Sequence, residues 1–286
     1  MRIAFFGSPE FVIPILSHIH EIFGVLLVVT QPDKPVGRKQ ILTPTPVKQF
    51  ALQHSISVIS DTSMIYIIEV VKKEKIDLAI VAAYGLIIPK EVLEKPKYGF
   101  INIHYSLLPK YRGASPVQTA IVNKEKTTGT TIMKMDEELD HGDIIQQKEV
   151  AIEENDTAQT LLNKLNEASL PLLDIALRTI EETGKFPPTT EQDHTKATFT
   201  HRLSKDDGFI EFDRIKEALK GSASRQIHDL IRGYSPWPGA WTTLPNWKRL
   251  KLLSSEVKDN KLVLNEVQLE GKQKTNDQQT ISQFLS

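Results

Sequence analysis

Two polar side chains interrupt an otherwise apolar segment near the middle of the chain. Asn102 and His104 lie two positions apart in the run Gly99–His104, so in a β-strand both side chains point to the same face. An amide and an imidazole on one face can donate hydrogen bonds to a developing oxyanion, and a histidine can also transfer a proton near neutral pH. The alternative is that both groups only satisfy nearby main-chain atoms, and the pair by itself does not decide between the two.

The acidic segment Asp136–Asp143 offers the carboxylate that could orient such a histidine. We expect Asp140 to point inward, because it lies between a leucine and a His-Gly turn, and we expect the other carboxylates to be solvated. A zinc site made of His104, Asp140 and His141 would leave the amide of Asn102 without a role. The chain also has no cysteine, which excludes disulfides, thiolate zinc sites and cysteine nucleophiles. We therefore expect a site without a metal.

The first half of the chain alternates short apolar runs with segments that suit helices. The expected strands are Arg2–Phe6, Gly24–Thr30, Leu78–Ala82 and Gly99–His104, and the expected helices are Glu10–Ile22 and Thr62–Glu74. This alternation predicts an α/β fold with a doubly wound, mostly parallel sheet, whose ligands bind at the carboxyl ends of the strands. The turn Gly7-Ser8-Pro9 is not a Gly-x-Gly-x-x-Gly fingerprint, so a nicotinamide dinucleotide is not indicated.

Two further strands and a long helix are expected next. The strands are Thr130–Met135 and Ile144–Val150, on either side of the acidic loop. Asp156 or Thr157 can cap the following helix, whose leucines and isoleucines recur at helical spacing. We expect Pro171 to kink or interrupt this helix, because proline lacks the N–H that a helix interior requires.

A chain of 286 residues is long enough for two domains. We expect a catalytic domain at 1–187, a polar linker at 188–204 and a smaller domain at 205–286. Short strands within roughly 80 residues predict a small β-barrel for the last part, of the oligonucleotide-binding type. Residues 201–286 hold 14 Lys and Arg against 11 Asp and Glu, within a chain whose net charge is −1. This surplus permits an RNA partner, although random scatter would also give it.

Nothing in the sequence indicates a membrane or an export signal. No run approaches the ~18–20 apolar residues of a membrane span, and the first residues lack a charged region followed by a cleavage site. We expect a cytoplasmic protein.

The polar residues of the central segment form a recognisable pattern. Asn-x-His-x-Ser-Leu-Leu-Pro beginning at Asn102, with Leu-Asp-x-Gly placing Asp140 38 positions later, resembles the signature of the formyltransferases that use 10-formyltetrahydrofolate. These enzymes act on glycinamide ribonucleotide, methionyl-tRNA or sugar amines. The resemblance implies that Asn102, His104 and Asp140 are catalytic, that 10-formyltetrahydrofolate is the co-substrate and that no metal takes part. It also implies that the folate site is lined by Ser106, Leu107, Leu108 and Pro109.

Other segments resemble the methionyl-tRNA branch of this family. The loop Thr30–Lys48 is similar to the one that this branch inserts after its second strand, and the resemblance places Arg38 at the position of the tRNA-binding arginine. We expect Lys34, Arg38 and Lys39 to meet the acceptor-stem backbone, although Lys34 and Lys39 also suit a solvated surface loop. The same branch is indicated by Gly113–Gln118, Gly129–Asp136, Ser235–Gly239 and Glu266–Lys272. The implied partners are initiator methionyl-tRNA and tetrahydrofolate, and we expect a monomer.

Three alternatives and three departures from the pattern accompany this interpretation. The alternatives are a sugar-nucleotide amine formyltransferase, a hydrolase of 10-formyltetrahydrofolate and an RNA-binding module without activity. Glu138 stands where the family usually has glycine, and Tyr105 where it usually has a small residue. The C-terminal part is also shorter than usual, which leaves the extent of its tRNA contact open.

Overall fold

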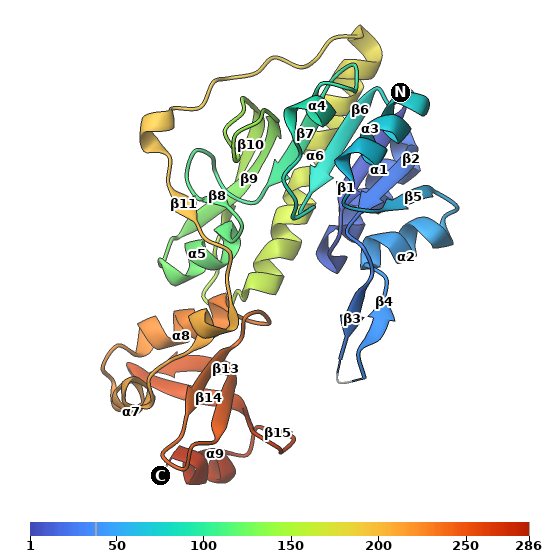
Figure 1. Cartoon of the computed structure of the whole chain (residues 1–286). Helices are drawn as coiled ribbons and strands as arrows, with labels where there is room; N and C mark the ends of the chain where they lie inside the picture. Colours follow the sequence, from blue (N-terminus) through green and yellow to red (C-terminus); the bar gives the residue numbers. More distant parts are fainter. Residues whose placement is uncertain (38, 286) are drawn as a thin grey trace. The chain divides into compact units, whose positions relative to one another are not determined.

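The computed structural model of the chain describes residues 1–37 and 39–285. Across these residues its main element is a seven-stranded sheet in the order β10-β9-β7-β6-β1-β2-β5 (Figure 1). The strands are β1 (Ile3–Gly7), β2 (Val25–Thr30), β5 (Ser57–Ser60), β6 (Leu78–Ala82), β7 (Phe100–His104), β9 (Thr127–Lys134) and β10 (Ile144–Ala151). The five strands from β7 to β5 are parallel, and β9 joins β7 in the antiparallel direction. The predicted mostly parallel sheet is confirmed.

The strand order explains where a ligand site belongs. From β1 the chain moves outward to β2 and β5, then returns to the other side of β1 to form β6 and β7. In such doubly wound sheets the ligand binds beyond the carboxyl ends of the strands, near this reversal. The sequence reaches this arrangement because its central strands are mainly apolar; β1, β6 and β7 are buried along their whole length, with Asn102 and His104 the two polar residues of β7.

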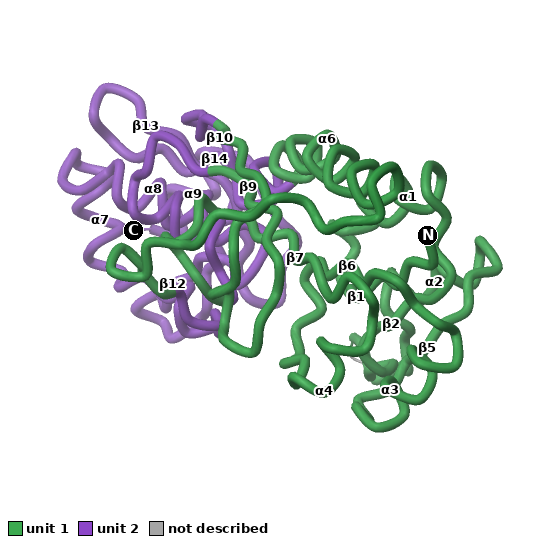
Figure 2. Tube along the Cα trace, turned by 90° about the horizontal axis from the view of Figure 1, so that it is seen from above, with its two compact units in different colours: residues 1–113, 129–150, 163–199 green, residues 114–128, 151–162, 200–286 purple. Residues whose placement is uncertain are grey.

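Helices cover both faces of the sheet. Figure 2 shows α1 (Ile13–Phe23), α2 (Pro46–Gln53) and α6 (Ala158–Thr183) on one side, and α3 (Met64–Lys73) and α4 (Lys90–Leu93) on the other. Alternate residues of β1 supply the two faces: Ala4 and Phe6 pack in one core cluster with Ile67 and Val71 of α3.

Helix α6 runs through Pro171, so the expected interruption is wrong. Leu165 and Leu173, on either side of the proline, are fully buried. Burial of each leucine side chain contributes roughly 1.5–3 kcal/mol, which together offsets the ~3 kcal/mol that a proline costs in a helix interior. The predicted cap is confirmed at Thr157, whose Oγ1 accepts a hydrogen bond from the N–H of Thr160.

The chain divides into two compact units, coloured green and purple in Figure 2: residues 1–113, 129–150 and 163–199, and residues 114–128, 151–162 and from 200 onward. The second unit contains α5 (Pro116–Val122), η3 (Lys205–Gly208), α7 (Phe212–Lys220), α8 (Ser224–Gly233), β12 (Ala240–Thr243), β13 (Arg249–Lys258), β14 (Lys261–Leu269), β15 (Lys274–Thr275) and α9 (Gln278–Leu285). Its strands pair antiparallel in the order β12-β13-β14-β15.

The short C-terminal strands that the sequence predicts are present, but they form an antiparallel sheet that is not closed into the expected barrel. Within the described residues β12 and β15 are its two edge strands. Helices cover the apolar face that a barrel would enclose: Ile215 of α7, Ile227 of α8 and Ile281 of α9 are buried in one cluster with Leu250 and Val267 of the sheet.

Short elements complete the fold. The strands β3 (Lys34–Val36) and β4 (Ile41–Thr43) form an antiparallel hairpin, and β8 (Arg112–Gly113) pairs with β11 (Phe199–Thr200). Two 3-10 turns, η1 (Glu10–Val12) and η2 (His194–Lys196), precede α1 and β11. Of the helices in the described residues, none is long and apolar enough to span a bilayer.

Candidate active site

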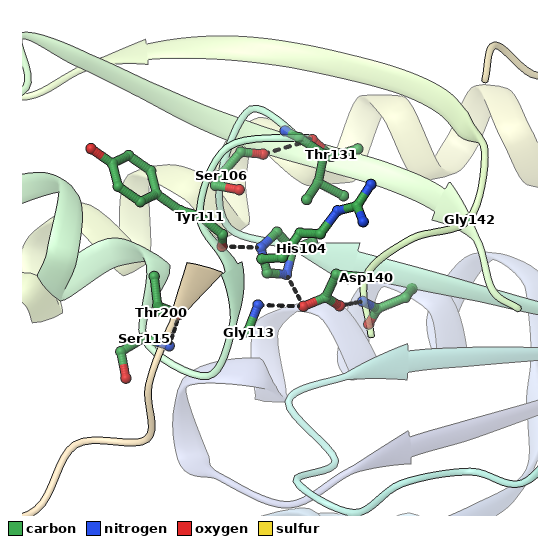
Figure 3. Close-up of polar contacts among 12 residues, drawn as sticks. His104, Ser106, Tyr111, Gly113, Ser115, Thr131, Asp140, Gly142 and Thr200 are labelled. Atoms are coloured by element: carbon green, nitrogen blue, oxygen red, sulfur yellow. Dashed lines mark hydrogen bonds and ion pairs between the residues drawn. The ribbon is translucent and has the colours of Figure 1, made fainter. Parts of the chain in front are cut away.

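The three residues expected to be catalytic lie together near the carboxyl end of β7, and Figure 3 shows His104 facing Asp140. Asn102 and His104 share one face of the strand and are 9% and 5% exposed. Asp140 comes from the loop between β9 and β10 and reaches both. The Nδ2 of Asn102 donates to Oδ1 of Asp140 at 3.4 Å, and Oδ2 of Asp140 lies 3.5 Å from Nδ1 of His104. The structure therefore brings together the whole predicted trio.

The protonation of His104 follows from a main-chain contact. Its Nε2 lies 2.9 Å from the carbonyl oxygen of Tyr111. A carbonyl can only accept a hydrogen bond, so Nε2 must carry a proton. The other ring nitrogen, Nδ1, is then the one that can gain or lose a proton, and it is the one that faces Asp140. The geometry gives His104 one fixed donor and one exchangeable position.

The Asp140 carboxylate is held by a main-chain N–H of β8. Its Oδ2 accepts a hydrogen bond from the N–H of Gly113 at 2.7 Å. Asp140 itself has a φ of 47°, in the left-handed region, and a side chain at Gly142 is excluded because its Cβ would lie 1.9 Å from the carbonyl oxygen of Lys134. The glycine of the Leu-Asp-x-Gly pattern therefore allows the close turn that points Asp140 inward.

The residues expected to line the folate site form the turn after β7. Ser106 and Leu108 are buried, whereas Leu107 and Pro109 are partly exposed. The hydroxyl of Ser106 donates to the carbonyl oxygen of Lys110 at 2.6 Å, so it shapes the turn from inside. Thr131 of β9 ties the turn to the sheet, accepting from the N–H of Leu108 and donating to the carbonyl oxygen of Ser106 (Figure 3).

The two departures from the family pattern do not enter the trio. Tyr105 comes directly after the last residue of β7 and is buried; its hydroxyl donates to Oδ1 of Asn166 at 2.8 Å and its ring packs edge-on against Phe11. This burial raises the pKa of the Tyr105 hydroxyl. Glu138 is an exposed residue of the acidic loop.

The residues expected to bind tRNA belong to a different element. Lys34 and Lys39 are exposed on the β3–β4 hairpin, and Arg38 lies outside the described residues. The hairpin follows β2, which is three strands away from β7 in the sheet order. The Nζ of Lys34 donates to Oε1 of Gln31 at 2.6 Å. The sequence suggested a proline-rich loop here, and the strand pairing Lys34–Thr43 gives it a defined form.

Some residues of the site were missed by the sequence reasoning. Tyr111 and Gly113 act through their main-chain atoms, which a pattern of side chains does not mark. Gln192 lies in the segment read as a linker, yet its Nε2 donates to the carbonyl oxygens of Asp140 and Gly142 at 3.0 and 2.7 Å. Nothing in its sequence neighbourhood distinguishes this glutamine from a solvated one.

The arrangement suits acyl transfer with proton transfer. Asn102 has a second N–H to donate, Nδ1 of His104 is the ring nitrogen available for proton exchange, and the Asp140 carboxylate lies beside it. Over the described part of the chain, no three His, Asp or Glu side chains are placed to hold a metal ion.

Comparison with known proteins assigns this site to a family. The formyl transferase family matches residues 1–175, and the formyl transferase C-terminal domain matches residues 202–263. A methionyl-tRNA formyltransferase of Caldicellulosiruptor saccharolyticus is 44% identical over 262 residues, which cover 90% of this chain and 80% of that relative.

Solved structures agree in fold. The methionyl-tRNA formyltransferase of Clostridium thermocellum is 19% identical with a TM-score of 0.65, over 94% of this chain and 98% of that one. An N-formyltransferase of Helicobacter canadensis in complex with folinic acid and dTDP-3-aminofucose is 20% identical with a TM-score of 0.65, over 91% and 88%. At these identities the structures support the fold alone, whereas the family match and the 44% identical relative show that the chain belongs to the methionyl-tRNA formyltransferases.

Proposed function

We propose that Asn102, His104 and Asp140 transfer the formyl group of 10-formyltetrahydrofolate to the free amino group of methionyl-tRNA, giving N-formylmethionyl-tRNA for initiation. The observation that carries this proposal is the buried contact of one carboxylate with both an amide and an imidazole. Family membership supports the reaction class, and the residue roles rest on the geometry.

The chemistry assigns a part to each residue. The amino group attacks the formyl carbon, a C–N bond forms, and the carbonyl oxygen becomes an oxyanion that Asn102 can hold, joined by His104 once it has taken the amine's proton. Each such donor contributes about 3–4 kcal/mol at best. His104 takes the amine's proton at Nδ1 and delivers it to the folate nitrogen as the C–N bond to folate breaks. Asp140 stabilises the imidazolium between these steps.

The turn Ser106–Pro109 forms one wall of the folate site in this proposal. Ser106 and Leu108 fix its shape from inside, and the partly exposed Leu107 and Pro109 offer surface to the folate. The turn follows directly on His104, so a folate bound against it would hold its formyl group near the trio. The folinic acid bound by the Helicobacter canadensis relative is consistent with a folate donor in this fold.

The tRNA is assigned to the β3–β4 hairpin and the C-terminal unit. Lys34 and Lys39 are exposed cations on the hairpin, and with Arg38 they would meet the phosphate backbone of the acceptor stem. We assign the domain 205–286 to tRNA binding because it holds the surplus of positive charge, with 1–187 as the catalytic domain and 188–204 as the connection. We also infer a monomer that acts in the cytoplasm, where initiator tRNA is charged and used.

One assay separates the proposal from its alternatives. Formyl transfer from 10-formyltetrahydrofolate is measured with charged initiator methionyl-tRNA, with an amino sugar nucleotide and with water as acceptor, using the wild type and His104→Ala. We expect transfer to methionyl-tRNA alone, reduced at least ~10²-fold in His104→Ala. Preferred transfer to the amino sugar or release of formate would favour the sugar enzyme or the hydrolase, and no transfer at all would favour an RNA-binding module.

A further inference from the structure

Every hydrogen-bonding group of the Gln192 side chain is paired with a residue next to the trio. Its amide is buried, and the two Nε2 protons go to the carbonyl oxygens of Asp140 and Gly142. Its Oε1 accepts two hydrogen bonds from Arg112, from Nε at 3.2 Å and from a terminal nitrogen at 2.7 Å. A glutamine amide has two protons to donate, so both donors are committed to the Asp140 loop.

Arg112 lies in the short segment Tyr111–Gly113, which contacts the trio through its main chain. The carbonyl oxygen of Tyr111 accepts from His104, and the N–H of Gly113 donates to Asp140. Arg112, between these two residues in the sequence, is 4% exposed. The segment Tyr111–Gly113 therefore binds the imidazole and the carboxylate directly, and through Gln192 it also binds the main chain of the loop that carries the carboxylate.

The segment that carries Gln192 is fixed at both ends. Thr190 exchanges two main-chain hydrogen bonds with Ile144, each 2.8 Å long. Thr198 accepts from the main-chain N–H of Arg112 at 2.8 Å and, through its hydroxyl, from that of Tyr111 at 2.8 Å. The backbone anchors leave the amide of Gln192 little freedom, so it can act as a rigid support.

We propose that Gln192 is a positioning residue for formyl transfer, which holds the Asp140 carboxylate where it meets Asn102 and His104. This inference rests on the proposed roles of the trio. Asp140 adopts a φ of 47°, which an aspartate adopts at some cost, and no side chain is tolerated at Gly142. The amide of Gln192 donates to the carbonyl groups of both Asp140 and Gly142, and these two hydrogen bonds stabilise the turn relative to conformations without positive φ at Asp140. Gln192 touches no reacting atom.

A purely structural role for Gln192 would require fewer of its hydrogen bonds than a positioning role does. If it only anchors its own segment, the bond from Arg112 to Oε1 is sufficient, and a carboxylate would serve as well or better. Gln192→Glu keeps that acceptor, removes both donors and turns an oxygen toward two carbonyl oxygens. Gln192→Met keeps the length and removes all polar atoms. Glu191→Gln is the matched control, because Glu191 is the adjacent residue and 82% exposed.

The experiment measures turnover, the Michaelis constant for methionyl-tRNA, folate binding and the pH–rate profile, with rates normalised to the fraction of molecules that bind folate. We expect both Gln192→Glu and Gln192→Met to lower turnover about 10- to 100-fold, the scale of a displaced reacting group. Folate binding and the Michaelis constant should stay unchanged, the pH–rate profile should shift, and Glu191→Gln should match the wild type.

Wild-type turnover in the folded Gln192→Glu protein would overturn the inference. So would a loss of turnover that disappears when rates are normalised to the folate-binding fraction, with an unchanged pH–rate profile. Including His104→Ala in the series separates the two proposals. If that variant is active, the roles of the trio are wrong; if it is inactive while both Gln192 variants are normal, only the role of Gln192 is wrong.

Discussion

Replacing Asp140 by asparagine changes one atom and should disable the site. In the wild type Oδ2 accepts from the N–H of Gly113 and Oδ1 accepts from the amide of Asn102. An asparagine has one acceptor oxygen and one donor NH2 group. If the asparagine oxygen faces the N–H of Gly113, its NH2 group faces the NH2 group of Asn102, and two donors meet. If the oxygen faces Asn102 instead, the NH2 group faces both the N–H of Gly113 and the ring of His104. Neither orientation satisfies every partner.

The size of the effect follows from two separate losses. The variant removes the negative charge that stabilises the imidazolium of His104, and loss of acid–base assistance lowers rates by about 10²–10⁴-fold. At 1.36 kcal/mol per tenfold, the barrier rises by about 2.7–5.4 kcal/mol. The N–H of Gly113 also loses a charged acceptor, which should lower the free energy of unfolding by about 1.5–3 kcal/mol. Folate affinity should change little.

Single-turnover formylation of methionyl-tRNA at saturating folate tests this expectation, since it reports the chemical step. Asp143→Asn is the control: Asp143 lies in the same loop, but its Oδ2 accepts from the hydroxyl of Thr189 and not from the trio. We expect Asp143→Asn to behave like the wild type. A folded Asp140→Asn protein with a chemical rate near that of the wild type would falsify the assignment of Asp140.

Three further outcomes are expected. Arg38→Ala should weaken the use of methionyl-tRNA by roughly 1–3 kcal/mol with folate binding unchanged, and equal kinetics would reject a tRNA role. Tyr105→Phe should lower the free energy of unfolding by about 1–3 kcal/mol, because buried Asn166 loses its donor, yet leave turnover intact; reduced turnover would contradict the placement of Tyr105 outside the site. Burial lowers the pKa of His228 below 6.5, so as the pH falls below 6.5 the unfolded state binds a proton while the folded state keeps the imidazole neutral. The stability present above pH 6.5 should therefore fall as the pH drops further. His228→Gln should flatten this dependence of the melting temperature on pH.

The parts of the fold that the sequence predicts well are those fixed by local pattern. The strand limits agree within a few residues, because a strand buried on both faces must be apolar throughout. Asn102 and His104 were identifiable because a polar pair on such a strand has no packing use. Asp140 was harder, since five carboxylates share its loop and only the inward turn at Gly142 singles it out.

What the sequence did not predict depends on contacts between distant segments. Residues 188–199 are polar and rich in threonine, which is typical of a linker, and their order comes from bonds to β8 and to Ile144. The hairpin β3–β4 has a proline within its first strand, where periodicity gives no strand signal. The C-terminal sheet is covered by α7, α8 and α9, which are separate in the sequence, and no local pattern indicates that they pack on one face.

Three backbone conformations with positive φ meet at the candidate site for a physical reason. Tyr111, Gly113 and Asp140 have φ values of 61°, 108° and 47°, and each places one main-chain or carboxylate atom against another member of the group. A regular strand could not do this, because successive residues of a strand point their main-chain groups sideways into the sheet and not toward one catalytic face. Bending the chain through left-handed conformations turns a carbonyl toward His104 and an N–H toward Asp140. The cost of such conformations is borne only where surrounding contacts fix them, and the buried amide of Gln192 supplies those contacts from a segment far along the chain.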